Sequence, residues 1–288
     1  MGDGWISRRN VLAALTAVSG WAQLPNTEPE FVCPMDRDVR SSTPGKCPRC
    51  GMKLVAGIPE TREYFVEMKR DGPRLALLVR DPSSGKPVRD FEVMHERIFH
   101  LFVISQDLEV FAHVHPEFDP ASAEFRIELQ LPKPGMYRVL SDFYPHGGAP
   151  QLIAGTFMVP GVGFRIATAA PPPDLQPKRG ENIDAELLLE PQRPLAGFKT
   201  IMFFRVSPVD GLEAYLGAMG HMMAASADLI DMMHLHPVYV TDDPGTAAKQ
   251  IQFNIIFPRE GMHRVWVQFQ RAGVVNTVAF NVPVGALR

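Results

Sequence analysis

Residues 100–116 read HLFVISQDLEVFAHVHP, and residues 221–237 read HMMAASADLIDMMHLHP. Three histidines and one proline of the first stretch recur in the second at a constant offset of 121 positions. Further on, LPKPGMYRV (131–139) recurs as FPREGMHRV (257–265), with an offset of 126 positions. Self-similarity at a fixed spacing indicates a repeated structural unit. The chain therefore uses one type of domain twice.

Each copy has the periodicity of β-strands. Polar and apolar residues alternate in FRIEL (125–129), and short apolar runs such as HLFVI (100–104) and TIMFF (200–204) are typical of buried strands. Clusters rich in glycine and proline separate these stretches. We predict a mainly β protein with two tandem antiparallel immunoglobulin-like β-sandwiches, at residues 62–160 and 180–285. Residues 161–179 are predicted to be a proline-rich linker.

The composition excludes several classes of function. The chain has 288 residues, with 29 Lys and Arg against 32 Asp and Glu, so its net charge is −3. It contains no basic tract, and we expect no nucleic-acid partner. It also contains no Gly-rich phosphate loop, no nucleophile elbow and no His-Glu-x-x-His motif. We therefore expect a protein that is not an enzyme.

Residues 1–22 predict an export signal. Arg8 and Arg9 precede a short apolar run, and small residues follow at Gly20 and Ala22. The paired arginines resemble those of a twin-arginine signal. An uncleaved amphipathic helix is the alternative. Because the apolar run is far shorter than the roughly 20 residues that span a bilayer, we expect an exported, periplasmic or extracellular protein with no membrane span in its mature form.

All three cysteines lie in one small module at residues 31–57. Its candidate ligands for a soft metal are Cys33, Met35, Cys47, Cys50 and Met52. The Cys-Pro-Arg-Cys-Gly turn places two thiolates on one knuckle, as in tetrahedral zinc sites and other soft-metal sites. The alternative is a disulfide from the first cysteine to one of the other two, formed after export without metal.

The module resembles the short heavy-metal-binding domain found beside copper-transporting P-type ATPases and copper or silver efflux adaptors. The resemblance rests on Cys33-Pro34-Met35, Pro44-Gly45-Lys46-Cys47-Pro48 and Cys50-Gly51-Met52. It implies binding of metal ions, copper as Cu(I) or else Zn or Ag(I), with a metal transporter or efflux component as partner. This chain has Asp36 where the family usually has histidine, which offers a hard oxygen in place of a nitrogen ligand.

Each repeat also carries three histidines that predict a second kind of metal site. The triads are His100, His113 and His115 in the first repeat and His221, His234 and His236 in the second. On a strand, the imidazoles of a His-x-His pair point to one face, about 6.5–7 Å apart along the chain. The histidine 13 positions earlier lies one hairpin away, and three imidazoles suit Cu(II), Zn or Ni. The alternative is structural, since a duplication also copies histidines that only cap a sheet edge by hydrogen bonds.

Together these patterns favour an exported heavy-metal-binding protein, with copper as the first candidate, for sequestration or delivery. We expect metal captured by the thiolates and thioethers to pass to the imidazoles of the adjacent sandwich by ligand exchange. One alternative is a metal-free immunoglobulin-like interaction or assembly module. A second is a copper-dependent redox enzyme, although both repeats lack the cysteine that a blue-copper centre requires.

Overall fold

The structure is a computed structural model, and it describes residues 31–32, 39–46, 48, 54–56, 62–146, 149–164, 166, 169–243 and 246–287. The export signal predicted at residues 1–22 and the five candidate soft-metal ligands of the cysteine module lie outside the described residues. The chain divides into two units, Met1–Glu60 and Thr61–Arg288. Within the described part, no helix is long and apolar enough to cross a membrane.

The first unit contains a small antiparallel sheet with the strand order β2-β1-β3. Its strands are β1 (Phe31–Val32), β2 (Arg40–Ser41) and β3 (Val55–Ala56). Leu54 is buried and packs against Phe31 and Val39. An apolar core of this size contributes little stability, and modules of this kind commonly depend on bound metal for the rest.

The second unit begins with an antiparallel sandwich. One sheet has the order β4-β5-β10-β9, the other has the order β12-β11-β7-β8, and β6 pairs with β11. The strands are β4 (Phe65–Asp71), β5 (Arg74–Arg80), β6 (Phe91–Glu92), β7 (Phe99–Ser105), β8 (Phe111–Val114), β9 (Glu117–Asp119), β10 (Glu124–Glu128), β11 (Gly135–Pro145) and β12 (Gln151–Val159). Alternate residues of the two sheets, among them Leu77, Phe125 and Val139, form its core.

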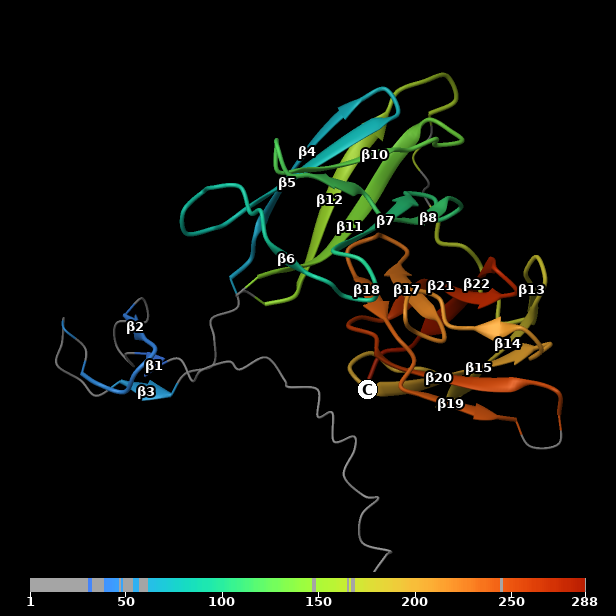
Figure 1. The fold of residues 1–288 in the computed structure, drawn as a ribbon. Helices are drawn as coiled ribbons and strands as arrows, with labels where there is room; N and C mark the ends of the chain where they lie inside the picture. Colours follow the sequence, from blue (N-terminus) through green and yellow to red (C-terminus); the bar gives the residue numbers. More distant parts are fainter. Residues whose placement is uncertain are drawn as a thin grey trace, which may run out of the picture. The chain divides into compact units, whose positions relative to one another are not determined.

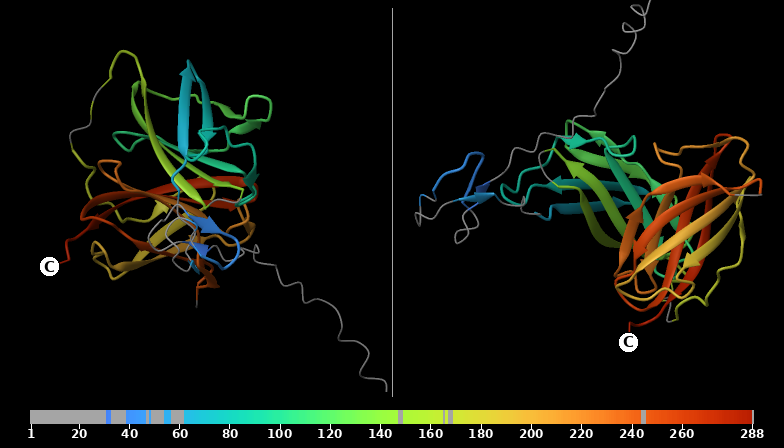
Figure 2. Two further views of the ribbon diagram at one scale, coloured as in Figure 1. Left: turned by 90° about the vertical axis from the view of Figure 1, so that its left-hand side faces the viewer. Right: turned by 90° about the horizontal axis from the view of Figure 1, so that it is seen from below.

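The second sandwich repeats this plan with one added edge strand, β13. One sheet has the order β13-β14-β15-β20-β19, and in the other β22, β21, β17 and β18 follow one another while β16 pairs with β21. The strands are β13 (Lys178–Arg179), β14 (Asp184–Glu190), β15 (Lys199–Ser207), β16 (Leu212–Glu213), β17 (His221–Ser226), β18 (Met232–Leu235), β19 (Tyr239–Asp242), β20 (Lys249–Ile256), β21 (Gly261–Arg271) and β22 (Val274–Val284). In Figure 2, the red strands β21 and β22 lie in one layer and the yellow strands β14 and β15 lie in the other. The predicted mainly β fold with two immunoglobulin-like sandwiches is confirmed.

The two sandwiches pack against each other through equivalent surfaces. β7 and β17 are buried along their whole length, because each strand faces its own core on one side and the other sandwich on the opposite side. In Figure 1, β7 and β8 (green) lie beside β17 and β18 (orange). The apolar cluster between the sandwiches consists of Phe102, Ile104, Leu108 and Leu140 from the first and Met223, Ala225, Leu229 and Trp266 from the second. These residues correspond one to one at the repeat offsets, so the packing has pseudo-twofold symmetry.

The recurring Asp-Leu pair forms the turn of the hairpin in each sandwich. Asp107 accepts hydrogen bonds from the Ser105 hydroxyl (2.6 Å) and the backbone N–H of Glu109 (3.2 Å), and Asp228 does the same in the second copy. The following leucines, Leu108 and Leu229, have φ values of 64° and 55°. This left-handed backbone is unfavourable for leucine, and each of these side chains is buried in the cluster between the sandwiches.

Candidate metal centre

The structure brings the six histidines of the two repeats to one place, where the sandwiches pack. In each triad, one ligand nitrogen per histidine lies within 4.8 Å of the others. Rings of different triads are also close, since the centroid of His113 lies 5.6 Å from that of His221 and 5.9 Å from that of His234. We call these two triads the six-histidine centre.

A β-hairpin assembles each triad. β7 pairs with β8 so that Phe102 lies opposite His113, and β17 pairs with β18 so that Met223 lies opposite His234. The first histidine of a triad lies on the first strand, and the His-x-His pair lies on or directly after the second strand. The pairing across one hairpin agrees with the arrangement expected from the sequence.

Backbone carbonyls fix the tautomer of the first histidine in each triad. His100 donates Nε2–H to the carbonyl of Met94 at 3.0 Å, and His221 donates Nε2–H to the carbonyl of Tyr215 at 2.9 Å. Burial lowers the pKa of His100, and it lowers the pKa of His221 to about 4. Both rings are therefore neutral at pH 7, and Nδ1 of each keeps a free lone pair.

The two carbonyls belong to equivalent tight turns, at residues 94–97 and 215–218. The central residues of both turns have positive φ, which is the geometry of a type I′ turn. His95 and Glu96 have φ values of 47° and 63°, and Leu216 has 50°. Such values are unfavourable for residues other than glycine and commonly persist where a functional site holds them. Here the turns place the carbonyls that orient the first histidines.

The second histidine of each triad is oriented by the opposite sandwich. His113 donates Nδ1–H to the amide oxygen of Gln268 at 2.7 Å, and the amide nitrogen of Gln268 donates to the Thr277 hydroxyl. His234 donates Nδ1–H to the Asp142 carboxylate at 2.6 Å. Such partners on the second ring nitrogen are typical of histidines that ligate metals. Nε2 of both histidines is left with its lone pair.

These tautomers leave ring nitrogens facing each other with no proton between them. His100 Nδ1 lies 3.1 Å from His113 Nε2, and His221 Nδ1 lies 3.3 Å from His234 Nε2. His236 Nε2 is the third nitrogen of the second triad, 3.1 Å from His221 Nδ1. Two nitrogens bound to one zinc ion at about 2.0–2.1 Å lie roughly 3.0–3.4 Å apart. The donor set of each triad therefore fits a divalent metal ion.

Burial keeps the other histidines in the form that binds metals. It lowers the pKa of His115 to about 4 and that of His236 to about 2, and it lowers the pKa values of His113 and His234 strongly. Burial raises the pKa of Asp142 to about 6, so its carboxylate is still mostly ionised at pH 7. Nε2 of His115 is buried without a hydrogen-bond partner among the described residues.

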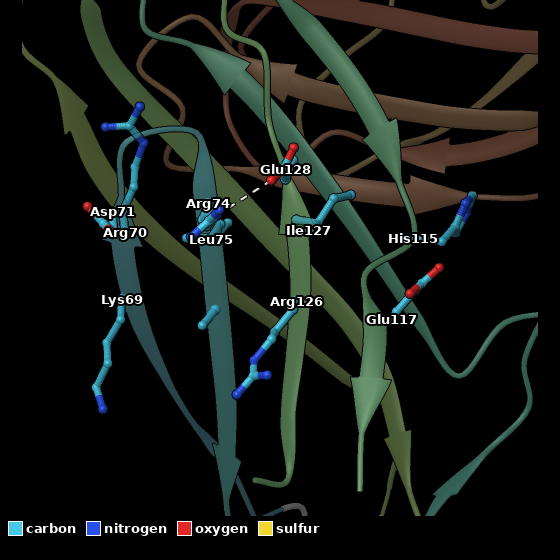
Figure 3. A pocket seen from close by; sticks show the side chains of 11 residues that line it. Lys69, Arg70, Asp71, Arg74, Leu75, His115, Glu117, Arg126, Ile127 and Glu128 are labelled. Atoms are coloured by element: carbon cyan, nitrogen blue, oxygen red, sulfur yellow. Dashed lines mark ion pairs between the residues drawn. The ribbon is translucent and has the colours of Figure 1, made fainter. Parts of the chain in front are cut away.

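Two cavities reach the first triad. One, of about 710 Å³, is lined by Lys69, Arg74 and Arg126 and has His115 and Glu117 at its opposite side (Figure 3). The other, of about 680 Å³, is lined by both His113 and His115. Neither cavity is lined by a histidine of the second triad. These cavities give small ligands a route to the first triad.

Sequence reasoning missed the residues that support the triads. Asp142 and Gln268 occupy equivalent positions of β11 and β21, opposite His100 and His221, but their residue types differ, so comparing the repeats did not reveal them. His95 stands five positions before His100 in the sequence, but its contact with the second triad was not predicted: its ring stacks on that of His236 with the centroids 3.6 Å apart. The one sequence signal that could have paired Asp142 with Gln268 is the repeat offset of 126 positions.

Methionines near the second triad have a packing role. Met222 and Met223 are almost completely buried, Met222 in the core of the second sandwich and Met223 in the cluster between the sandwiches. Both side chains are packed among apolar residues. Burial in apolar clusters therefore accounts for both of these methionines.

Comparisons with known proteins identify two families. The family model described as "Heavy metal binding domain" matches residues 31–56, which confirms the resemblance drawn from the cysteine module. The model described as "Domain of unknown function (DUF8832)" matches residues 68–161 and 184–286, more than half of the chain. No curated protein matches the chain.

Among solved structures, the chain is similar to FdeC, an Escherichia coli adhesin, with 14% identity and a TM-score of 0.25, covering 82% of this chain and 68% of that one. It is also similar to a carbohydrate-binding module of the β-sandwich superfamily, with 10% identity and a TM-score of 0.21, covering 78% of this chain and 100% of that one. Similarities at this level carry no conclusion about ligands.

Proposed function

The chain belongs to the family described as "Domain of unknown function (DUF8832)", and we propose that it is an exported protein that binds a heavy metal, with copper as the first candidate, for sequestration or delivery. The observation that carries the proposal is the pair of facing imidazole nitrogens in each triad, 3.1 and 3.3 Å apart. Facing lone pairs repel each other, and a cation between them turns the repulsion into coordination.

The hydrogen bonds favour metal binding over a purely structural role. A histidine that only caps a sheet edge uses its N–H and its lone pair in hydrogen bonds, because buried polar atoms are normally satisfied. In four of the six histidines, His100, His113, His221 and His234, the N–H group already points at a carbonyl, amide or carboxylate oxygen. The remaining lone pairs point at one another, which is what a metal site without its ion looks like.

Copper is the first candidate because both regions of the chain suit it in different oxidation states. Three imidazoles suit Cu(II) or Zn, and Cu(II) binds such ligands most tightly among the divalent ions of its row. For the soft site we propose Cu(I) on Cys33, Met35, Cys47, Cys50 and Met52, supported by the family match over residues 31–56. Metal captured there would pass by ligand exchange to the imidazoles, and a metal transporter or efflux component would be its partner.

We propose binding rather than catalysis. The sandwiches contain no cysteine, so a blue-copper electron-transfer centre has no thiolate ligand. The proposed exported location, periplasmic or extracellular, rests on the twin-arginine-like segment at residues 1–22. Such a binding protein has three requirements. Its ligands must be present, its thiols must be reduced, and the ion must be able to reach them.

Equilibrium titration of the chelator-treated full chain with Cu(II) tests the function. The comparison variant replaces all six histidines of the six-histidine centre with alanine. We expect binding by the parent that the variant loses, whereas a metal-free assembly module would bind no more copper than the variant. In parallel, Cys47→Ser with Cys50→Ser should abolish Cu(I) binding by the module without changing the unfolding of the sandwiches, and unchanged Cu(I) affinity would contradict the thiolate role.

A further inference from the structure

The two triads are built from the same residue types but are supported differently. Resting on the proposed metal-binding function, we propose that they are an unequal pair of metal sites. The first triad, His100, His113 and His115, is an exchange site that loads and releases its ion readily. The second triad, His221, His234 and His236, is a retention site that holds its ion longer. Asp142 of the first sandwich sets this difference.

The first observation is the charge of the group that orients each central histidine. His234 donates to the carboxylate of Asp142 at 2.6 Å, whereas His113 donates to the neutral amide of Gln268 at 2.7 Å. A carboxylate on the second ring nitrogen raises the basicity of the imidazole and its hold on the metal. A negative charge beside the second triad also offsets part of the charge of a divalent ion. Asp142 is only 6% exposed, so water screens this effect little.

The second observation is the placement of the third ligand. In the second triad, His236 Nε2 already lies 3.1 Å from His221 Nδ1, so three nitrogens converge. In the first triad, Nε2 of His115 has no polar partner within hydrogen-bond distance among the described residues. A bound ion must therefore draw His115 closer to the other two ligands, and ligands that are preorganised bind with less loss of free energy.

The third observation is access. Cavities of about 710 and 680 Å³ reach His115, and the second also reaches His113. In the second triad, the side chain of His234 is 1% exposed, and the ring of His95 stacks over His236. Release of a metal ion to an acceptor requires an incoming ligand, and these cavities offer such a ligand a route to His115 and His113. Charge and the placement of the third ligand favour the same order, and the cavities beside the first triad agree with it.

Transfer of copper to a chelator tests the inference. The full chain carries Cys33→Ser, Cys47→Ser and Cys50→Ser so that only the imidazole sites are observed, and it is loaded with Cu(II) and mixed with excess EDTA. We expect two bound ions and two release phases of equal amplitude. His113→Ala with His115→Ala should leave only the slow phase, and His234→Ala with His236→Ala should leave only the fast phase.

Asp142→Asn is the decisive variant. It should accelerate the slow phase by about 10–100-fold, the range for loss of a partner that orients a ligand, and leave the fast phase unchanged. The matched control is Asp243→Asn, which alters another buried carboxylate, one paired with Arg205, and should change neither phase. Gln268→Glu gives an independent test that does not depend on the folding of Asp142→Asn, and it should slow the fast phase.

The outcomes separate the inference from the function on which it rests. A single release phase in the parent, acceleration of the fast phase by Asp142→Asn, or an unchanged fast phase in Gln268→Glu would each overturn the unequal pair while leaving metal binding intact. Failure of the parent to bind any copper would overturn the proposed function itself.

Discussion

The carboxylate of Asp142 accepts a hydrogen bond of 2.6 Å from the ring of His234, although the two residues lie on different sandwiches. In the equivalent contact, His113 of the first sandwich donates to Gln268 of the second. Each triad therefore depends on the other sandwich for the orientation of its central histidine. The geometry of the six-histidine centre therefore depends on the packing of the two sandwiches, and this dependence links stability to metal binding.

Removing an apolar contact between the sandwiches should weaken copper binding even though every histidine is retained. Trp266 is 3% exposed and stacks on Phe111 from the other sandwich, with ring centroids 5.0 Å apart. Trp266→Ala should lower the free energy of unfolding by about 3–5 kcal/mol and weaken Cu(II) binding at both triads. Urea unfolding and copper titration measure the two effects. Ile230→Ala, at an exposed position, is the control, and full copper affinity in Trp266→Ala would refute the coupling.

Bound metal should stabilise the folded chain. A ligand that binds only the native state at 100 times its dissociation constant adds about 2.7 kcal/mol per site to the free energy of unfolding. Thermal or urea unfolding with and without Cu(II) should show this increase, and EDTA should reverse it. The variant with all six histidines replaced by alanine should show no increase, and equal stabilisation of parent and variant would mean that copper binds elsewhere.

The metal-free chain should lose stability in mild acid. Burial lowers the pKa values of His115 and His221 to about 4 and that of His236 to about 2, whereas in the unfolded chain histidine titrates near about 6.5. Below pH 6.5 the unfolded state therefore binds more protons, and the free energy of unfolding falls as the pH drops towards 4. Asp142, whose pKa burial raises to about 6, acts with the opposite sign but is one group against several.

Urea unfolding in EDTA at pH 7.5, 6.0 and 5.0 measures this dependence. His115→Gln combined with His236→Gln removes two of the groups responsible and should give a shallower decline. A free energy of unfolding that stays constant or rises towards pH 5 would contradict neutral, buried histidines in the folded state.

The tight turn at residues 94–97 should tolerate, and gain from, a glycine. Glu96 has a φ of 63°, and the equivalent position of the second repeat is Gly217 with 73°. Glycine adopts this backbone without the penalty of a side chain, so Glu96→Gly should raise the free energy of unfolding by up to about 1 kcal/mol. Copper affinity should not change, because the Met94 carbonyl stays in place. A clear loss of stability in urea would show that the Glu96 side chain makes a compensating contact.

The sequence was sufficient to predict the fold and the histidines of the site. Repeated strand-like runs predicted two sandwiches, and the recurrence of His100, His113 and His115 as His221, His234 and His236 predicted two triads on equivalent hairpins. Period-two alternation and hairpin spacing are local properties, so a single sequence carries them.

The sequence could not show that the two triads meet in one centre. That meeting depends on the packing of the two sandwiches through Phe102, Leu140 and Trp266, which are far apart in the chain. HLFVI (100–104) was identified as a buried run, but the sequence cannot distinguish burial against the other sandwich from burial in the strand's own core. The roles of Asp142 and Gln268 follow from this packing and became visible only with it.

X-ray absorption spectroscopy of the copper-loaded chain tests the central claim most directly. With Cys33, Cys47 and Cys50 replaced by serine, the first shell of Cu(II) should contain about three imidazole nitrogens near 2.0 Å, with the multiple-scattering signature of histidine rings and no sulfur. Loss of this signature in the variant with all six histidines replaced would confirm the assignment. A shell of oxygen atoms alone, or an unchanged histidine signal in that variant, would contradict it.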